Sequence, residues 1–201
     1  MVSALPASGF VLTGGGSKRM GRDKALLELA GQPLVLRTVE RLRPLVAEVA
    51  LVGSPERYAH LGVPTLADCE PGHGPLGGIV TALRASRHDW NLIVSCDLPY
   101  LEERFLRYLL EKAAQDAAAD AFVPCTEEHQ EPLCALYHRR CRAAFARVLG
   151  AGEGKIARAL AEVRVRAILP EEWRRFAFSE RMFKNMNTRE DYAEAQRLLG
   201  K

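Results

Sequence analysis

Short apolar runs alternate with longer amphipathic stretches along the N-terminal half of the chain. A short apolar run that ends in glycine, proline or aspartate indicates a buried strand followed by a loop. This pattern predicts strands at residues 9–12, 48–52, 64–66 and 91–95. Apolar residues at helical spacing predict the helices between them, at 34–46, 76–85 and 102–114. Such alternation is typical of a parallel sheet with helices on both faces.

The pattern is less regular after residue 120, but strands and helices can still be assigned. We predict strands at 121–124, 133–137 and 163–169, a short segment at 183–187, and helices at 139–149, 154–162 and 188–199. One strand near 133–137 is expected to run antiparallel. The expected fold is a three-layer α/β/α sandwich with a mostly parallel sheet, formed by a single domain over residues 1–201.

Composition narrows the class of protein. The chain has 201 residues, 48% of them hydrophobic and 26% charged, which is typical of a globular domain and not of a disordered or fibrous chain. No apolar run approaches the ~18 residues of a membrane helix, and the first residues lack the features of a secretory signal. A net charge of +3 is too small to indicate a nucleic-acid or membrane surface. Five scattered cysteines favour reduced thiols and a cytoplasmic location.

The first predicted strand is followed by a glycine-rich, strongly basic loop. Glycines 14–16 precede a cluster of four cations, Lys18, Arg19, Arg22 and Lys24. Glycines let a backbone approach a phosphate closely, and clustered cations repel one another unless an anion lies between them. The spacing fits neither a Walker A motif nor a dinucleotide-binding fingerprint. We expect this loop to bind the phosphates of a nucleotide.

A carboxylate stands at the end of the strand predicted at 91–95. Open parallel sheets bind ligands at the carboxyl ends of their strands, so Asp97 and the basic loop are expected to meet in one crevice. Asp97 offers the hard oxygen that Mg²⁺ prefers. The alternative role, a cap for the helix at 102–114, is weaker because Asp97 precedes that helix by five residues, with Pro99 between.

Four segments together resemble one enzyme family. The stretch 12–24 is similar to the Leu-x-Gly-Gly-x-x-x-Arg-Met-Gly-x-(x)-Asp-Lys signature of nucleotidyltransferases with a Rossmann-like fold. Asp68 with Gly-Pro-Leu-Gly-Gly at 74–78, Ser-Cys-Asp-Leu-Pro-Tyr at 95–100 and Phe-Lys-Asn-Met-Asn-Thr at 183–188 resemble three further segments of the molybdenum cofactor guanylyltransferases. The resemblance spans residues 9–199.

The resemblance implies transfer of GMP from GTP to molybdenum-molybdopterin, with Mg²⁺ as cofactor and pyrophosphate as the second product. It implies molybdenum-cofactor insertion or delivery proteins as further partners. The expected catalytic residues are Lys24, Arg19 and Asp97, with Asp97 holding the metal. The expected GTP-binding residues are Leu12, Thr13, Gly14, Gly15, Lys24, Asp68 and Asp97. The pterin side is expected to include Asn185 and Asn187. The attacking phosphate is already an anion, so neither a side-chain nucleophile nor a general base is required.

Several alternatives stay open on the sequence. The chain could be a cytidylyltransferase for the same pterin, a sugar-phosphate nucleotidyltransferase, or a GTP-binding module that delivers cofactor without catalysis. Asp68 could accept the N–H donors of guanine or only shape a turn, and the two asparagines could be turn residues. Thr13 stands where the family usually has alanine, and Gly53 stands where some members have asparagine.

Overall fold

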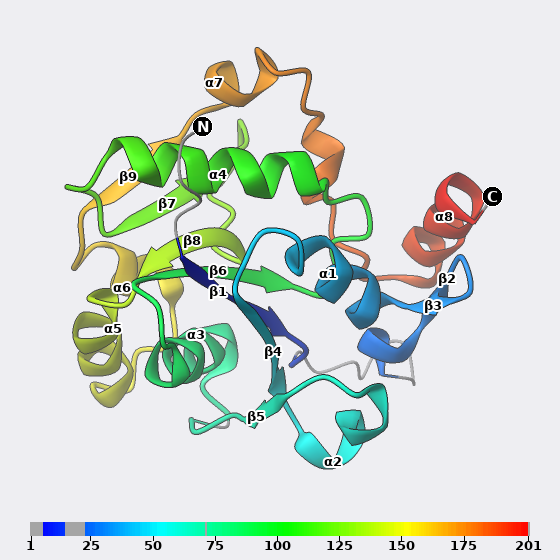
Figure 1. Ribbon diagram of the computed structural model, residues 1–201, viewed down its shortest axis with the longest axis horizontal. Helices are drawn as coiled ribbons and strands as arrows, with labels where there is room; N and C mark the ends of the chain where they lie inside the picture. The colour runs from blue at the N-terminus through cyan, green and yellow to red at the C-terminus, as the bar shows by residue number, and fades with distance from the viewer. Residues whose placement is uncertain (1–5, 15–22, 71, 201) are drawn as a thin grey trace.

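The computed structural model describes residues 6–14, 23–70 and 72–200. A seven-stranded sheet in the order β5-β4-β1-β6-β8-β7-β9 runs through the middle of these residues (Figure 1). Its strands are β1 (Ala7–Leu12), β4 (Glu48–Gly53), β5 (Thr65–Ala67), β6 (Trp90–Ser95), β7 (Ala121–Pro124), β8 (Cys134–His138) and β9 (Val165–Ile168). Each lies where the apolar pattern predicts a strand.

The strand directions bring the functional loops to one edge. β1 pairs in parallel with β4 and β6, and β4 pairs in parallel with β5. β8 is antiparallel to both β6 and β7, while β9 is parallel to β7. The antiparallel strand expected near 133–137 is therefore confirmed. The other strands of the sheet end at the edge where β8 begins, which we call the carboxyl edge.

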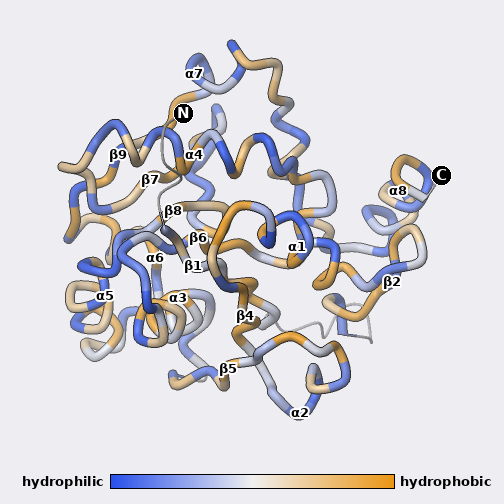
Figure 2. Tube along the Cα trace, in the orientation of Figure 1, coloured by the Kyte–Doolittle hydropathy of each residue, from blue (hydrophilic) through white to orange (hydrophobic). Residues whose placement is uncertain are grey.

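Helices cover both faces of the sheet (Figure 1). One face carries α1 (Leu34–Leu42) and α4 (Glu103–Gln115), and the other carries α3 (Gly74–Ala85), α5 (Cys141–Gly150) and α6 (Ile156–Leu160). Successive strand residues point to opposite faces, so Val11 joins the first core while Phe10 and Leu12 join the second. Figure 2 shows that hydrophobic and hydrophilic residues are both present along α4, as in an amphipathic helix. The expected three-layer α/β/α sandwich is confirmed.

Several short elements have no counterpart in the predicted pattern because they are too short to show periodicity. They are η2 (Lys24–Leu26), β2 (Glu28–Leu29), β3 (Gln32–Pro33), α2 (Pro55–Tyr58), η3 (Ala59–Leu61), α7 (Pro170–Arg174) and η4 (Glu180–Phe183). The helix predicted at 34–46 ends early, at Leu42, because Pro44 has no backbone N–H with which to continue the helical hydrogen bonds. The 183–187 segment is the end of η4 and an extended stretch.

The last helix, α8 (Arg189–Leu199), packs away from the main layers, beside the β2–β3 hairpin (Figure 1). A small apolar cluster joins them, formed by Leu29, Leu34, Met186 and Ala195. The Met186 N–H donates to the Asp97 carbonyl at 2.9 Å, which fixes the segment before α8 to the end of β6. Across the described ranges, no helix has the length and apolar character needed to span a membrane.

Candidate active site

Three predicted site residues come together at the carboxyl edge. Lys24 starts η2, and its Nζ donates to Asn187 Oδ1 at 2.7 Å. Asp97 follows β6, and Met186, next to Asn187, is bonded to its backbone carbonyl. The Ser95 hydroxyl donates to Asp97 Oδ1 at 2.6 Å and orients the carboxylate. Residues far apart in the chain thus place an ammonium, an amide and a carboxylate around one region.

The thiol of Cys96 lies close to this region, and the charged groups there change its pKa. Cys96 is buried, and burial raises the pKa of the thiol; the Asp97 and Asp23 carboxylates raise it further, while Lys24 lowers it. The thiol therefore keeps its proton at neutral pH. Its role is packing, and the charged groups around it belong to the site.

Thr13 closes the end of β1 against β4. Its backbone N–H and its hydroxyl both donate to the Val52 carbonyl, at 3.0 and 2.9 Å. A Cβ added to Gly53 would lie 2.0 Å from Thr13 Oγ1 and 3.0 Å from the Tyr58 ring. Thr13 thus occupies the space that a side chain at position 53 would need. The two departures from the family pattern, Thr13 and Gly53, are sterically coupled.

Tyr58 and Asp23 extend this wall toward Lys24. Tyr58 is buried and its hydroxyl donates to Asp23 Oδ2 at 2.8 Å. Burial and the Asp23 carboxylate raise the pKa of Tyr58, which therefore stays protonated and able to donate. Asp23 Oδ1 accepts the Ala25 N–H and caps η2. The cap fixes the backbone from which Lys24 projects.

Asp68 lies after β5, where its carboxylate shapes a turn. Oδ1 accepts the Glu70 N–H and the Thr81 hydroxyl, both at 3.0 Å. The Glu70 carbonyl comes so close to α3 that a Cβ at Gly77 would lie 2.7 Å from it. The turn-forming role considered for Asp68 is therefore present. If Asp68 also binds a nucleotide base, it would do so while keeping these contacts, which already orient its carboxylate.

A pocket of about 470 Å³ lies beside the segment that the Met186 N–H ties to the Asp97 carbonyl. Its walls come from two segments, 126–131 between these strands and 180–187 before α8. Asn185 and Asn187, the two residues expected on the pterin side, both line it. The carboxyl edge is thus divided, with Thr13, Gly53 and Asp68 along β1, β4 and β5, and this pocket beyond β6.

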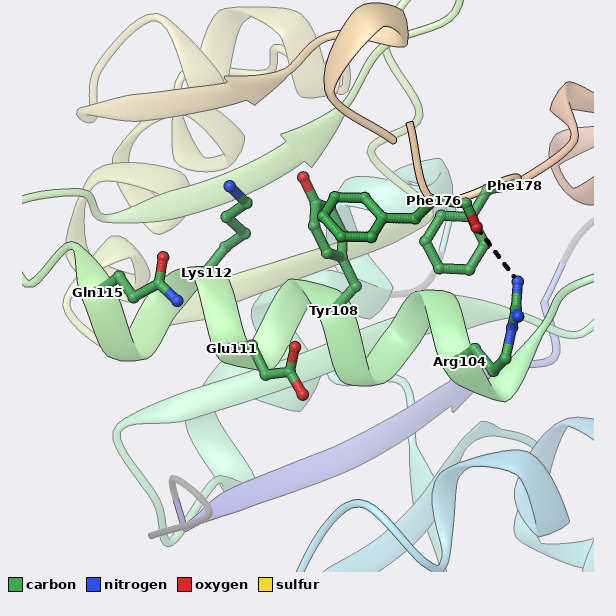
Figure 3. A pocket seen from close by; sticks show the side chains of 7 residues that line it. All are labelled: Arg104, Tyr108, Glu111, Lys112, Gln115, Phe176 and Phe178. Carbon is green, nitrogen blue, oxygen red and sulfur yellow. Dashed lines mark hydrogen bonds between the residues drawn. The ribbon is translucent and has the colours of Figure 1, made fainter. Parts of the chain in front are cut away.

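Another pocket, of about 410 Å³, lies along α4 (Figure 3). Its aromatic wall is formed by Tyr108, Phe176 and Phe178, and Phe176 is 54% exposed. Arg104 donates to the Phe176 carbonyl at 3.4 Å. None of the residues that line it belongs to the predicted site, so we assign it no part in the chemistry at the carboxyl edge.

The basic loop can be placed only in part. Leu12, Thr13, Gly14 and Lys24 lie within the described residues, at its two ends. Gly15 and Arg19, predicted to bind GTP and to act in catalysis respectively, fall outside the described residues. The neighbouring cations at 18 and 22 do so as well.

Comparison with known proteins identifies the family. Residues 9–167 match the model of the MobA-like NTP transferase domain, a match over most of the chain. The chain belongs to this family.

Curated relatives and solved structures agree with this MobA-like assignment. The chain is 35% identical to a probable molybdenum cofactor guanylyltransferase of Pelotomaculum thermopropionicum, over 96% of this chain and 93% of that protein. It is 34% identical to one of Carboxydothermus hydrogenoformans, over 94% of each. Among solved structures it resembles molybdopterin-guanine dinucleotide biosynthesis protein A from Archaeoglobus fulgidus, with a TM-score of 0.81 and 26% identity over 95% of this chain and 97% of that one.

The MobA-like chain carries a donor set that fits one kind of metal site. Among the described residues, no three His, Cys, Asp or Glu side chains gather as a group that could hold a metal ion. Asp97 is a half-buried carboxylate at a strand end, fixed by Ser95. Mg²⁺ commonly takes one or two carboxylates and completes its shell with water and substrate phosphates. Asp97 therefore fits a Mg²⁺ ion that binds together with a nucleotide.

The sequence alone does not show the roles of four residues of this MobA-like site. Ser95 orients Asp97, and Tyr58 holds Asp23. Arg41 of α1 donates to the Pro99 carbonyl at 3.0 Å and fixes the turn after Asp97; burial and the neighbouring Arg37 lower its pKa to about 10. Glu131 lines the pocket beside Asp97. Arg41, Tyr58 and Glu131 lie outside the four motif segments, and only their positions in space reveal them.

Proposed function

We propose that this chain transfers GMP from GTP to molybdenum-molybdopterin, forming molybdopterin guanine dinucleotide and pyrophosphate. The observation that carries this proposal is the contact between Lys24 and Asn187 beside Asp97. It joins the end of the phosphate-binding loop to the pocket on the other side of β6. A donor nucleotide on one side and an acceptor phosphate on the other would meet at this point. The names of the relatives support the choice of GTP and molybdopterin.

The chemistry needs positioned charge more than proton transfer. An oxygen of the acceptor's terminal phosphate attacks the α-phosphorus of GTP, and the bond to the bridging oxygen of the β-phosphate breaks. Negative charge grows on the non-bridging oxygens and on the departing pyrophosphate. The Lys24 ammonium, held by Asn187, lies where it can donate to these oxygens. A preorganised cation that binds the transition state more tightly than the ground state raises the rate.

Asp97 would hold Mg²⁺ together with the phosphates of GTP. The ion would supply positive charge that offsets the repulsion between two phosphates. Ser95, through its hydrogen bond to Oδ1, keeps the carboxylate turned toward the site. The fixed turn after Asp97, held by Arg41 through the Pro99 carbonyl, limits the movement of the carboxylate on binding.

Guanine is proposed to lie along β1, β4 and β5. Guanine presents two N–H donors on one edge, and Asp68 with the backbone at 74–78 can supply acceptors. Adenine has an acceptor at N1, and a desolvated acceptor without a donor costs about 1–3 kcal/mol. Thr13 fills the wall behind this region and bonds to Val52 instead of projecting a polar group. We therefore expect GTP to be preferred over ATP and CTP.

The proposed function is tested by pyrophosphate release from the purified chain. Release should require GTP, Mg²⁺ and molybdenum-molybdopterin together, and CTP or ATP should replace GTP poorly. Efficient turnover with CTP would assign the chain to cytidylyl transfer instead. Tight GTP binding without any pyrophosphate release would assign it to cofactor delivery. We propose that the reaction takes place within a single domain and, given five free cysteines, in the cytoplasm.

A further inference from the structure

The pocket beside Asp97 contains a buried carboxylate that the proposed mechanism does not use. Glu131 is 7% exposed, and its Oε1 lies 2.9 Å from His129 Nε2. The His129 side chain is 60% exposed and is a weak partner for a buried charge. Burying a carboxylate is costly unless it is well paired. The burial and weak pairing of Glu131 therefore favour a role in binding a ligand in the pocket.

Backbone hydrogen bonds fix the segment that carries Glu131. The Glu131 N–H donates to the Pro124 carbonyl at 2.7 Å, and the Cys134 N–H donates to the Glu131 carbonyl at 3.1 Å. These bonds attach the residue to the end of β7 and the start of β8. The Ser95 N–H donates to the Leu133 carbonyl at 2.7 Å and links the same segment to β6. The main chain of Glu131 is thus fixed to the strands that flank the end of β6.

Different parts of the pocket offer hydrogen-bond donors and acceptors. Asn187, which accepts a hydrogen bond from Lys24, lines the pocket together with the cations Arg181 and Lys184, while Glu131 and Glu180 offer acceptors. Burial raises the pKa of Glu131; His129 lowers it, and the carboxylates of Glu180 and Asp97 raise it again. A phosphate beside Glu131 would add another negative charge to this group. The Glu131 end is therefore suited to N–H donors, and the Lys24 end to a phosphate.

We infer that Glu131 binds the N–H edge of the acceptor's pterin ring and so selects the acceptor. A pterin has a 2-amino-4-oxo ring whose N3–H and amino group are parallel donors, and a carboxylate accepts both with its two oxygens. Phe183, which also lines the pocket, gives the ring an apolar surface. The acceptor's phosphate then lies toward Lys24. This inference rests on the proposed function and adds the residue that reads the acceptor.

Binding of free ring compounds tests this role without any transfer reaction. Lumazine is the pteridine in which an oxygen replaces the 2-amino group of pterin, so it presents an acceptor where pterin presents a donor. The wild-type chain with Mg²⁺ and GTP should bind pterin at least about tenfold more tightly than lumazine, and Glu131→Gln should remove this preference. Equal binding of the two compounds to the wild type, or failure of both to bind, would overturn the inference.

Kinetics of the full reaction give the second test. Glu131→Gln should raise the KM for molybdenum-molybdopterin about tenfold or more, with a smaller change in kcat and unchanged GTP and Mg²⁺ dependence. His129→Gln is the matched control, because it removes the ion pair and keeps the carboxylate. An equal effect of the two variants would mean that the ion pair is only structural. A changed Mg²⁺ dependence would place Glu131 at the metal; either result contradicts the inference.

The two proposals fail in different ways. If the wild-type chain releases no pyrophosphate from GTP with the molybdopterin acceptor, the proposed function is wrong whatever the ring compounds do. If the wild type turns over and Glu131→Gln keeps the wild-type KM for the acceptor, the proposed function stands and the role of Glu131 is wrong.

Discussion

Lys24 is the residue on which the proposed chemistry depends most. The residue is half-buried at the start of η2, and its ammonium donates to Asn187. Lys24→Ala removes a preorganised donor to the developing negative charge. We expect turnover to fall about 10²- to 10³-fold, with a smaller change in GTP affinity. Steady-state kinetics and GTP titration measure both quantities, and Lys155→Ala, at an exposed lysine before α6, is the control. Near-normal turnover in Lys24→Ala would remove this residue from catalysis.

Thr13 and Gly53 should behave as one unit in stability measurements. A methyl group at position 53 meets the Thr13 hydroxyl at 2.0 Å, so Gly53→Ala alone should lower the free energy of unfolding by about 1–3 kcal/mol. Thr13→Ala removes the obstructing atom, and the double variant should regain most of that loss. Urea unfolding of the wild type and three variants measures the coupling. Strictly additive effects would contradict the steric account.

At the scale of residues, motif spacing points to the ends of strands but not to what surrounds them. Asp97 and Lys24 can be identified because each ends a recognisable segment. The turn contact of Asp68 with Thr81 depends on how α3 packs, which the sequence does not state. Tyr58 and Glu131 lie in short or polar stretches, and they gain their roles only when the chain brings Asp23 and Asp97 beside them.

The start of α8 is the element that supports Asn187. Asp191 Oδ2 accepts the N–H groups of Asn187 and Thr188, both at 2.9 Å, and the Thr188 hydroxyl accepts the Asp191 N–H. Asp191→Ala should cost about 1 kcal/mol of unfolding free energy through loss of the cap. It should also lower turnover, because Asn187 loses its support beside Lys24.

The control for this prediction lies next in the chain. Glu190 is exposed in the first turn of α8, and Glu190→Ala should leave both stability and turnover close to wild type. Thermal unfolding and pyrophosphate release measure the two effects together. If Asp191→Ala unfolds more easily but turns over normally, then α8 does not position Asn187 for the reaction.

At the scale of elements, length decides what can be predicted. The strands and the longer helices have enough residues for their period to appear, and all of them are found. The β2–β3 hairpin is too short for a period, and its turn places Ala30, not only Gly31, at positive φ. The position of η2 depends on its cap, Asp23; the motif contains this aspartate but does not show that it caps a helix.

Asp120, just before β7, forms an ionic cluster that contributes to the stability of the fold in acid. Burial would raise the pKa of Asp120, but hydrogen bonds from the Arg164 side chain and backbone and from Arg140 outweigh it and lower the pKa from 3.8 to about 2. The side chain is only 12% exposed. Arg140 is therefore an ion-pair partner of Asp120.

This cluster predicts a pH dependence of stability. A lowered pKa stabilises the fold above the unfolded-state value of about 4, and this contribution is lost as the pH falls toward 2. The loss amounts to about 2 kcal/mol. Asp120→Asn should remove that much unfolding free energy at pH 7 and flatten the profile between pH 4 and 2. Asp89→Asn, at an exposed ion pair with Arg139, is the control and should change little. A profile for Asp120→Asn that parallels the wild type would contradict this account.

At the scale of the whole molecule, the account places a donor nucleotide and an acceptor on opposite sides of Lys24 and Asp97. The most direct test follows the α-phosphorus of GTP. With GTP labelled at that atom, Mg²⁺ and molybdenum-molybdopterin, the wild-type chain should form a labelled pterin dinucleotide, and Asp97→Asn should lose most of this product while melting near the wild-type temperature. No labelled dinucleotide from the folded wild-type chain, or equal yields from Asp97→Asn at every Mg²⁺ concentration, would contradict the account.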